Sequence, residues 1–253
     1  MTSRMGKTYF ASDFHLGVDA LHTSAERERL IVHWLDAIRS DAEAIYLVGD
    51  LFDYWFEYGE VVPKGAVRLL GKLAELRDSG IPIHTFTGNH DMWMFGYFEE
   101  ELDIPVHRKP IRREIAGKQF LIGHGDGLGP GDHGYKFIKR VFASPVSQWL
   151  FARIHPNTGM RLMRFFSGKS RDMTAVPEFL GEEKEWLVQY CKRKLETEHI
   201  DYFVFGHRHL PIDLTLPNGT SRYINLGDWL NHYTYGVFDG EEFRLERFET
   251  AEP

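Results

Sequence analysis

Hydrophobic and polar positions along the chain follow two different periods. Short apolar runs predict strands, and apolar residues three and four apart predict intervening helices: strands at 9–12, 44–48 and 81–87, and helices at 24–39 and 65–79. The later part of the chain favours hairpin strands with one long helix: a hairpin at 112–122 turning at Gly117, a helix at 182–197, and strands at 202–206, 222–226, 233–238 and 242–248. Helices between parallel strands, followed by a β-rich half, predict a layered α/β sandwich.

The size of the chain is compatible with one large domain. Its 253 residues are 43% hydrophobic and 14% aromatic, so we expect a single domain over residues 1–253 with a sizeable core. The single cysteine, Cys191, excludes an internal disulfide framework. The N-terminus is polar, and no run approaches the roughly 18 apolar residues of a membrane-spanning helix, so we expect a soluble, cytoplasmic protein.

Charge is spread unevenly along the chain. The net charge is −7, yet residues 128–171 hold eight Lys and Arg residues against one acid, Asp132. This segment therefore carries +7 and the remainder −14. Such asymmetry indicates a segment that meets an anionic partner.

Polar residues that could bind metals follow the predicted strands in five loops. A strand that ends in Asp-x-His would project both side chains to the same side, and ligands at the carboxyl ends of strands converge on one crevice. Each loop alone is equally compatible with a turn or a core histidine, but five together favour a metal site. The segments are DFH at 13–15, GDLFD at 49–53, GNHD at 88–91, HGD at 124–126 and GHRH at 206–209.

This ordered set of motifs resembles the calcineurin-like metallophosphoesterases over residues 13–209. The resemblance implies a β-sandwich flanked by helices in four αββα layers. It also implies two divalent metal ions. One would be held by Asp13, His15, Asp50 and His209, and the other by Asp50, Asn89, His124 and His207, with Asp50 as the bridge.

The chemistry of two metals accounts for these residue types. Two divalent ions roughly 3.5–4 Å apart lower the pKa of a shared water, so that a bridging hydroxide can attack a phosphoryl group. Mixed imidazole, carboxylate and amide ligands suit manganese, which we favour, or iron or zinc. We expect His90 and Asp50 to be catalytic, with His90 facing the phosphoryl group. Asp53, Asp91 and Asp126 are expected to orient the ligands, although each is almost equally compatible with a turn or cap.

Residues 133–171 are predicted to form a helical lid inserted into the domain. Two or three short amphipathic helices are expected between Tyr135 and Arg171, with basic residues interleaved among apolar stripes. One interpretation is an ordinary helical cap whose apolar stripes pack on the core. The other is a lid whose apolar side receives acyl chains and whose basic side faces phosphates or anionic lipid head groups.

The lid, together with DFHLG, GDLFDYW and the GHxH pattern, resembles the bacterial UDP-2,3-diacylglucosamine pyrophosphohydrolases of lipid A synthesis. The resemblance implies attack at the α-phosphate, giving UMP and 2,3-diacylglucosamine 1-phosphate, by a protein bound peripherally to the inner face of the bacterial inner membrane. Asp132 and Tyr135 match that group's Asp-x-x-Tyr, and Lys169 and Arg171 are further expected substrate contacts. The best-known members have arginine where this chain has His90, so the phosphate contact should differ.

Two other functions are compatible with the motifs. One is a phosphodiesterase acting on another nucleotide or a small phosphodiester, which would have no use for a large basic and aromatic lid. The other is a non-catalytic scaffold of the same fold, which the complete ligand set disfavours. Nucleic acid is not expected as a partner, because apolar helix faces interrupt the basic charges, and no protein partner is inferred.

Overall fold

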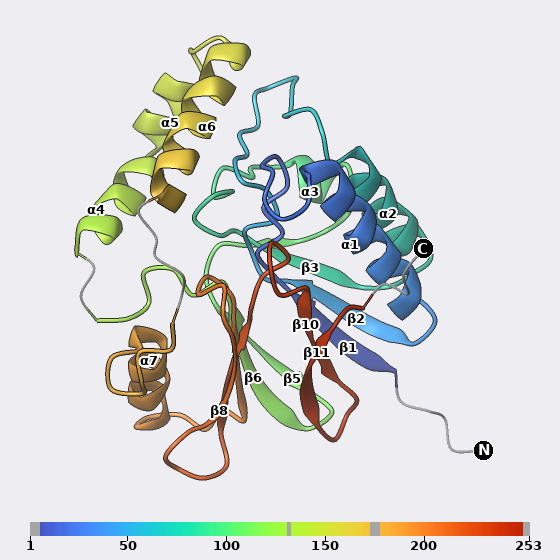
Figure 1. The fold of residues 1–253 in the computed structure, drawn as a ribbon, viewed down its shortest axis with the longest axis vertical. Coiled ribbons are helices and arrows are strands. Elements are labelled where there is room, and N and C mark those ends of the chain that lie inside the picture. The colour runs from blue at the N-terminus through green and yellow to red at the C-terminus, as the bar shows by residue number, and fades with distance from the viewer. Residues whose placement is uncertain (1–5, 131–132, 173–177, 250–253) are drawn as a thin grey trace.

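The computed structural model describes residues 6–130, 133–172 and 178–249, and for residues 133 and 169–172 it describes the backbone alone. Two mixed β-sheets pack face to face, with helices on their outer sides (Figure 1).

The first sheet has the strand order β11-β10-β1-β2-β3-β4. Strands β1 to β4 run parallel to one another, and β10 joins β1 in the antiparallel sense. Its strands are β1 (Lys7–Ala11), β2 (Ala42–Leu47), β3 (Ile83–Phe86), β4 (Val106–His107), β10 (Thr234–Phe238) and β11 (Phe243–Arg247).

The second sheet has the strand order β5-β6-β7-β9-β8. Strands β6, β7 and β9 are parallel, and β5 and β8 are antiparallel edge strands. Its strands are β5 (Ile111–Ile115), β6 (Lys118–Gly123), β7 (Tyr202–Phe205), β8 (Pro211–Thr215) and β9 (Arg222–Leu226).

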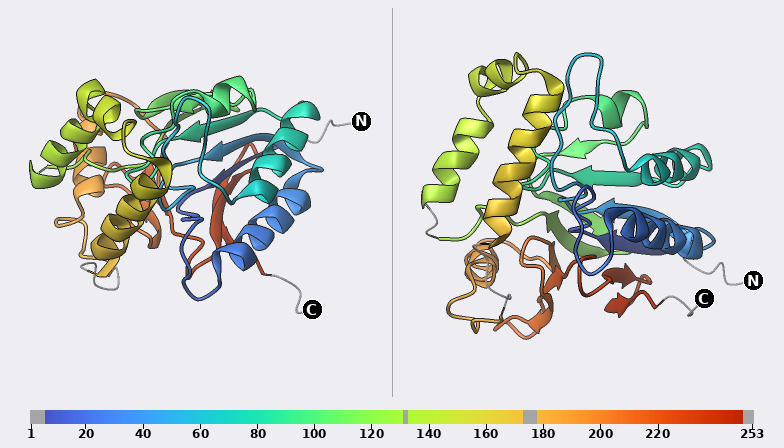
Figure 2. Two further views of the ribbon diagram at one scale, coloured as in Figure 1. Left: turned by 90° about the horizontal axis from the view of Figure 1, so that it is seen from above. Right: turned by 45° about the horizontal axis from the view of Figure 1, so that its top comes forward.

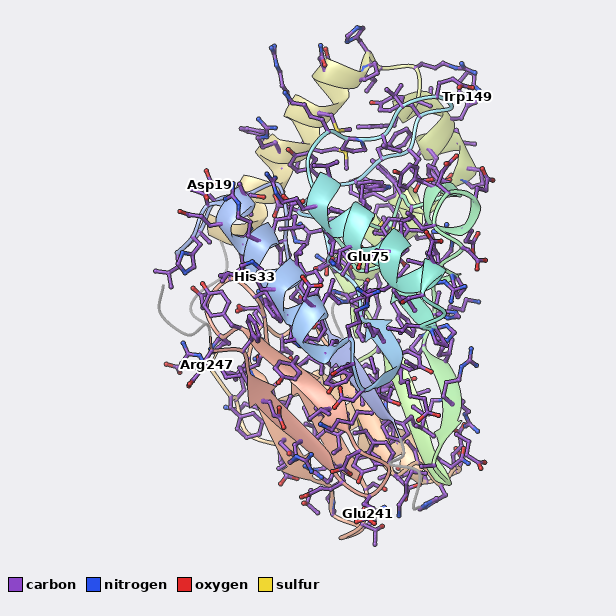
Figure 3. The ribbon with its side chains drawn as sticks, turned by 90° about the vertical axis from the view of Figure 1, so that its right-hand side faces the viewer. Asp19, His33, Glu75, Trp149, Glu241 and Arg247 are labelled. Atoms are coloured by element: carbon purple, nitrogen blue, oxygen red, sulfur yellow. The ribbon has the colours of Figure 1, made fainter. Side chains whose placement is uncertain are left out.

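Three of the helices cover the sheets. Helices α1 (Ser24–Ile38) and α2 (Val67–Asp78) lie side by side over the first sheet (Figure 3), and α7 (Trp186–Leu195) packs on the second. Thr23 and Glu26 form a capping box, which explains why α1 begins at Ser24. The other helices are α3 (Tyr97–Glu100), α4 (His133–Phe142), α5 (Pro145–Phe151) and α6 (Pro156–Asp172).

Apolar side chains form three cores that match this layering. Between the sheets, Phe10 stacks on Tyr46 and Phe120. Trp34 of α1 belongs to the core outside the first sheet, and Cys191 of α7 to the core outside the second. The predicted αββα sandwich is therefore confirmed.

The predicted elements agree with this fold except at a few short or irregular segments. Helix α3 and strands β4 and β8 were not predicted from the sequence. Strand β8 begins with Pro211, which an edge strand tolerates and which weakens a sequence-based strand signal. The long helix begins at Trp186 rather than Glu182, and α6, at 17 residues, is not the short helix expected there.

Helices α4, α5 and α6 occupy the segment where a helical lid was predicted, and they lie to one side of both sheets (Figure 2); we call these three helices the lid. Figure 3 places Trp149 of α5 at the opposite end of the molecule from Glu241. Ten large apolar side chains on these helices are between 39% and 66% exposed, whereas Phe142 and Phe151 also pack on Trp93, with ring centroids 5.5 Å and 4.8 Å apart. The interpretation of a cap with its apolar stripes packed on the core therefore describes only part of these helices. The ten exposed side chains are Phe137, Ile138, Val141, Phe142, Val146, Trp149, Leu150, Leu162, Phe165 and Phe166.

Candidate active site

The predicted metal ligands lie in loops that follow β1, β2, β3, β6 and β7. Strand β1 ends at Ala11, so the expectation that Asp13 and His15 share a strand face is wrong. They converge through left-handed backbone instead, at φ 57° and 46°. Such conformations cost about 1–3 kcal/mol each and concentrate at functional sites. Five predicted ligands adopt them: Asp13, His15, Asp50, His207 and His209.

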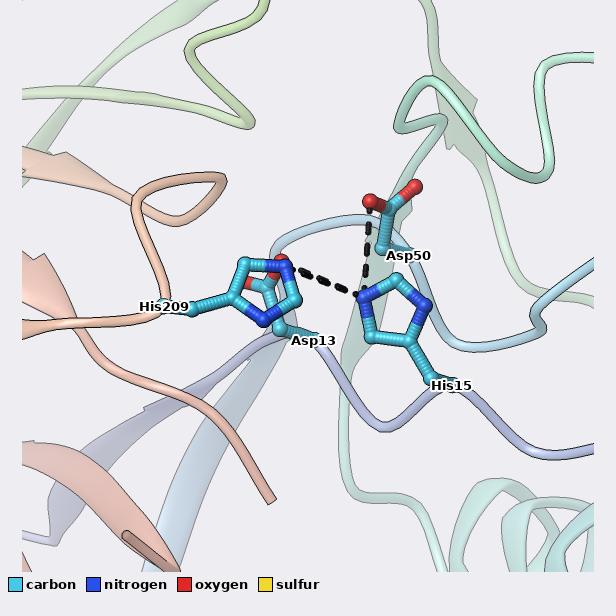
Figure 4. A group of neighbouring side chains, drawn as sticks. All are labelled: Asp13, His15, Asp50 and His209. Atoms are coloured by element: carbon cyan, nitrogen blue, oxygen red, sulfur yellow. Dashed lines mark hydrogen bonds and ion pairs between the residues drawn. The ribbon is translucent and has the colours of Figure 1, made fainter. Parts of the chain in front are cut away.

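The first predicted set of ligands is gathered in one place (Figure 4). Nε2 of His209 lies 3.2 Å from Oδ1 of Asp13 and 3.2 Å from Nε2 of His15. Nε2 of His15 lies 3.7 Å from Oδ2 of Asp50. One ligand atom from each of the four residues lies within 4.8 Å of the others, which is compatible with a single ion.

The second predicted set adjoins the first at Asp50. Oδ2 of Asp50 lies 3.3 Å from Nε2 of His124, and ligand atoms of Asp50, His124 and His207 lie within 4.8 Å of one another. Oδ1 of Asn89 lies 3.2 Å from the same nitrogen of His124. Asp50 therefore faces both groups, as a bridging carboxylate must.

The buried charges of this cluster fit divalent cations. Within the described part of the chain, Oδ1 of Asp13 and Oδ2 of Asp50 are buried and accept no hydrogen bond. Burial opposes charge on the rings of His15 and His124, but the surrounding carboxylates outweigh it and raise the pKa of both histidines to about 10. The cluster thus attracts positive charge, and its imidazole, carboxylate and amide donors suit transition metals.

The three aspartates expected to orient the ligands occupy different positions. Oδ1 of Asp53 lies 3.5 Å from Nδ1 of His15, beside a predicted ligand. Asp91 accepts hydrogen bonds of 2.7 Å from the backbone N–H groups of Leu51 and Gly88, and so joins the loops after β2 and β3.

The third aspartate, Asp126, contacts the lid. Its Oδ2 accepts a hydrogen bond of 2.5 Å from the Tyr135 hydroxyl and pairs at 2.5 Å with Nζ of Lys139. Both partners lie on α4, so Asp126 connects the loop after β6 to the first lid helix.

His90 lies at the edge of the cluster. Its backbone N–H donates to Oδ1 of Asp50 at 2.8 Å, and its Nδ1 lies 3.1 Å from the Asp53 carbonyl oxygen. Burial, only partly offset by the nearby carboxylates, lowers the pKa of the His90 ring, which favours the neutral imidazole. A ligand atom from each of His15, Asp53 and His90 also lies within 4.8 Å of the others.

Two residues that support the predicted ligands were missed from the sequence. Oδ2 of Asp228 lies 3.4 Å from Nδ1 of His209, so its carboxylate can fix that ring. Arg27 is fully buried and donates hydrogen bonds to the carbonyls of Phe14 and His15. The sequence LGD before Trp229 repeats the glycine-aspartate pattern of the other loops and could have identified Asp228, whereas Arg27 carries no such signal.

The lid reaches the cluster through α6. The Ser167 hydroxyl donates a hydrogen bond of 2.7 Å to Oδ2 of Asp53 and lies 3.4 Å from Nδ1 of His90. Among the predicted substrate contacts, Tyr135 lies beside Asp126, 2.5 Å away. Asp132 and the side chains of Lys169 and Arg171 lie outside the described residues.

Comparisons with known proteins agree with this arrangement. The chain is 40% identical to the UDP-2,3-diacylglucosamine hydrolase of Porphyromonas gingivalis, over 97% of this chain and 99% of that protein. It is 29% identical to the protein of the same name from Ectopseudomonas mendocina, over 92% and 97%. A hypothetical protein from Pyrococcus horikoshii shares the fold, with a TM-score of 0.51 and 10% identity over 97% of this chain and 88% of that chain. Residues 6–211 match the family model described as calcineurin-like phosphoesterase, and the chain belongs to that family.

Proposed function

We propose that this chain hydrolyses the diphosphate of UDP-2,3-diacylglucosamine, giving UMP and 2,3-diacylglucosamine 1-phosphate. The observation that carries the proposal is a cluster of metal ligands linked by Ser167 and Asp126 to helices with exposed apolar faces. The name that both curated relatives carry supports the same substrate.

Two divalent ions fit the cluster, and we propose manganese, with iron or zinc as alternatives. Bound there, they would supply Lewis acidity and lower the pKa of a shared water. The residues that would hold them are Asp13, His15, Asp50, Asn89, His124, His207 and His209.

His90 is proposed to contact the phosphoryl group through its Nε2 atom. The Asp53 carbonyl oxygen can only accept a hydrogen bond, so the Nδ1 atom of His90 carries a proton and donates it. In the neutral ring, Nε2 is then the nitrogen left for the substrate. Asp53 thus fixes both the tautomer and the orientation of His90, because its carboxylate also lies 3.8 Å from Nδ1.

The lid supports a lipid substrate over a small diester. Each methylene transferred from water to the exposed apolar surface of α4, α5 and α6 contributes about 0.8 kcal/mol, so two acyl chains would add substantial affinity. Tyr135 is placed near the cluster by its bond to Asp126, and we propose that it contacts the substrate together with Asp132, Lys169 and Arg171.

The membrane surface is the proposed site of action. No helix in the described part of the chain is both long and apolar enough to cross a membrane. We propose instead that the apolar and basic lid, residues 133–171 of one domain, binds the anionic inner face of the bacterial inner membrane.

Hydrolysis in oxygen-18 water tests the proposed reaction. Purified protein with manganese and UDP-2,3-diacylglucosamine should release UMP that carries the label, because attack occurs at the α-phosphate. Label on the lipid phosphate, or failure to cleave this substrate while a small phosphodiester is hydrolysed, would contradict the proposal.

A further inference from the structure

A cavity of about 310 Å³ adjoins the predicted metal cluster and has no role in the function proposed above. Its walls come from the end of β3, the connection from β4 to β5, the loop after β6 and α4. His124 belongs both to this wall and to the cluster, where its Nε2 lies 3.3 Å from Oδ2 of Asp50. The volume falls within the range of small-molecule sites, roughly 300–1,000 Å³.

The cavity is strongly basic. Four cationic side chains line it, Arg108, Lys109, Lys136 and Lys139, and Asp126 is the carboxylate among its lining residues. Lys139 pairs with Asp126 at 2.5 Å. The three other cations pair with no carboxylate among the residues that the structure describes. We call this site, lined by Arg108, Lys109, Lys136 and Lys139, the basic cavity.

Backbone carbonyls hold two of the unpaired cations in place. Nζ of Lys136 donates to the Gly129 carbonyl oxygen at 2.5 Å, and the Arg108 guanidinium donates to the carbonyl oxygen of Met92 at 3.2 Å. A neutral carbonyl orders these groups without cancelling their charge. The basic cavity therefore presents fixed positive charge beside the place where a phosphate would be held.

Helix α4 lies between the basic cavity and the exposed apolar surface of the lid. Lys136 and Lys139 are three residues apart on one face and line the cavity. Phe137 and Val141, on a different face, are 63% and 40% exposed. A substrate with an apolar half and an anionic half would find the two matching surfaces on either side of one helix.

We infer that the basic cavity binds the nucleotide half of the substrate, an inference that rests on the proposed function. Lys and Arg side chains donate hydrogen bonds and cannot accept them. At position 4 uracil presents a carbonyl acceptor, whereas cytosine presents an amino donor that a Lys or Arg donor cannot pair with. Phe86, Pro110 and Leu128 supply apolar wall for the flat base. The cavity should therefore prefer UMP to CMP.

Binding measurements on single variants test this inference. Lys109→Met and Lys136→Met each remove a donor and a charge while keeping most of the side-chain length. Lys118→Met is the matched control, because Lys118 begins β6 at the end opposite the cavity and lies 3.8 Å from Asp201. The manganese-loaded proteins are titrated calorimetrically with UMP, with CMP and with inorganic phosphate, and circular dichroism checks their folding.

Both cavity variants should weaken UMP binding at least tenfold and reduce the preference for UMP over CMP. Binding of inorganic phosphate, which the metal cluster alone can hold, should change less than threefold, and the control should match the wild type. Unchanged UMP binding, or an equal loss for UMP and phosphate, would overturn the inference. If Lys136→Met fails to fold, the exposed Lys109 still provides the test.

Wild-type hydrolysis of UDP-2,3-diacylglucosamine is measured on the same preparation. Absence of hydrolysis would count against the proposed function itself. Hydrolysis by the wild type, combined with normal UMP binding in both cavity variants, would reject the nucleotide site alone.

Discussion

The Ser167 hydroxyl of lid helix α6 donates a hydrogen bond of 2.7 Å to Oδ2 of Asp53, next to the cluster of predicted metal ligands. Asp53 also faces His15 and His90, with its Oδ1 3.5 Å from Nδ1 of His15 and 3.8 Å from Nδ1 of His90. One buried hydroxyl thus connects the position of the lid to the orientation of two site histidines.

Replacing Ser167 with alanine should lower turnover of the lipid substrate about tenfold. A hydrogen bond to a charged group contributes roughly 1.5–3 kcal/mol, and this substitution removes the one that the Ser167 hydroxyl donates to the Asp53 carboxylate. Metal content should stay at the wild-type level, because Ser167 contacts none of the predicted ligands. Ser147→Ala on α5 is the matched control. Normal turnover in Ser167→Ala would show that the contact does not position the site.

Asp50→Ala should abolish activity and remove most of the bound metal, because Asp50 faces both ligand groups. Asp53→Ala should lower metal affinity or activity by roughly 10- to 100-fold, a smaller loss than that of Asp50→Ala, because Asp53 acts through His15 and His90. Elemental analysis of the dialysed proteins measures the metal per chain. Equal metal content in the wild type and the Asp50 variant would reject the bridging assignment.

Asp228→Asn should weaken the binding of one of the two proposed metal ions by roughly 10- to 100-fold. Asp228 lies 3.4 Å from Nδ1 of His209, and the loss of its charge weakens the bond that orients this ring. Competition with a metal-binding dye should show one weakened and one unchanged site. Asp239→Asn, in the hairpin before β11, should leave both sites as in the wild type.

Acid should destabilise the fold through His84. Burial, with the nearby charges of His107 and Arg113, lowers the pKa of His84 to about 4. Because an unfolded histidine titrates near 6.5, the unfolded chain gains a proton at this position before the folded one does. The contribution to stability is thus complete above about pH 6.5 and is lost as the pH falls toward 4.

The substitution His84→Phe checks this prediction. It keeps an aromatic ring against Tyr46, since the ring centroids of His84 and Tyr46 lie 4.9 Å apart. The free energy of unfolding is measured by urea denaturation at pH 7 and pH 5. It should fall less between these pH values in His84→Phe than in the wild type. An identical fall in both proteins would show that His84 does not contribute.

The fold was predictable because each core strand is a short apolar run and because loops that contain glycine follow these runs. Strand β7, with the sequence YFVF, is buried along its whole length, as such a run implies. Strand β8 was missed because it is an edge strand that begins with Pro211 and buries only Ile212. Edge strands carry a weaker apolar signal than central ones.

The sequence predicted which residues gather at the site better than it predicted the backbone conformation that brings them together. Asp13 and His15 were expected on a strand face, yet they converge through left-handed backbone after β1 has ended. Arg27 was missed because its spacing is that of an ordinary helix residue, and its burial depends on loop carbonyls distant in sequence. Contacts such as that between Ser167 and Asp53 join residues 114 positions apart, which no local pattern reveals.

We propose that the cluster of predicted metal ligands acts on a lipid-linked diphosphate held by the lid. The most direct measurement compares kcat/KM for UDP-2,3-diacylglucosamine with that for UDP-N-acetylglucosamine, which has the same diphosphate without the two long acyl chains. Because each buried methylene contributes about 0.8 kcal/mol, we expect kcat/KM to be at least about a thousandfold higher for the lipid. Equal cleavage of both substrates, or faster cleavage of the unacylated one, would contradict the proposal.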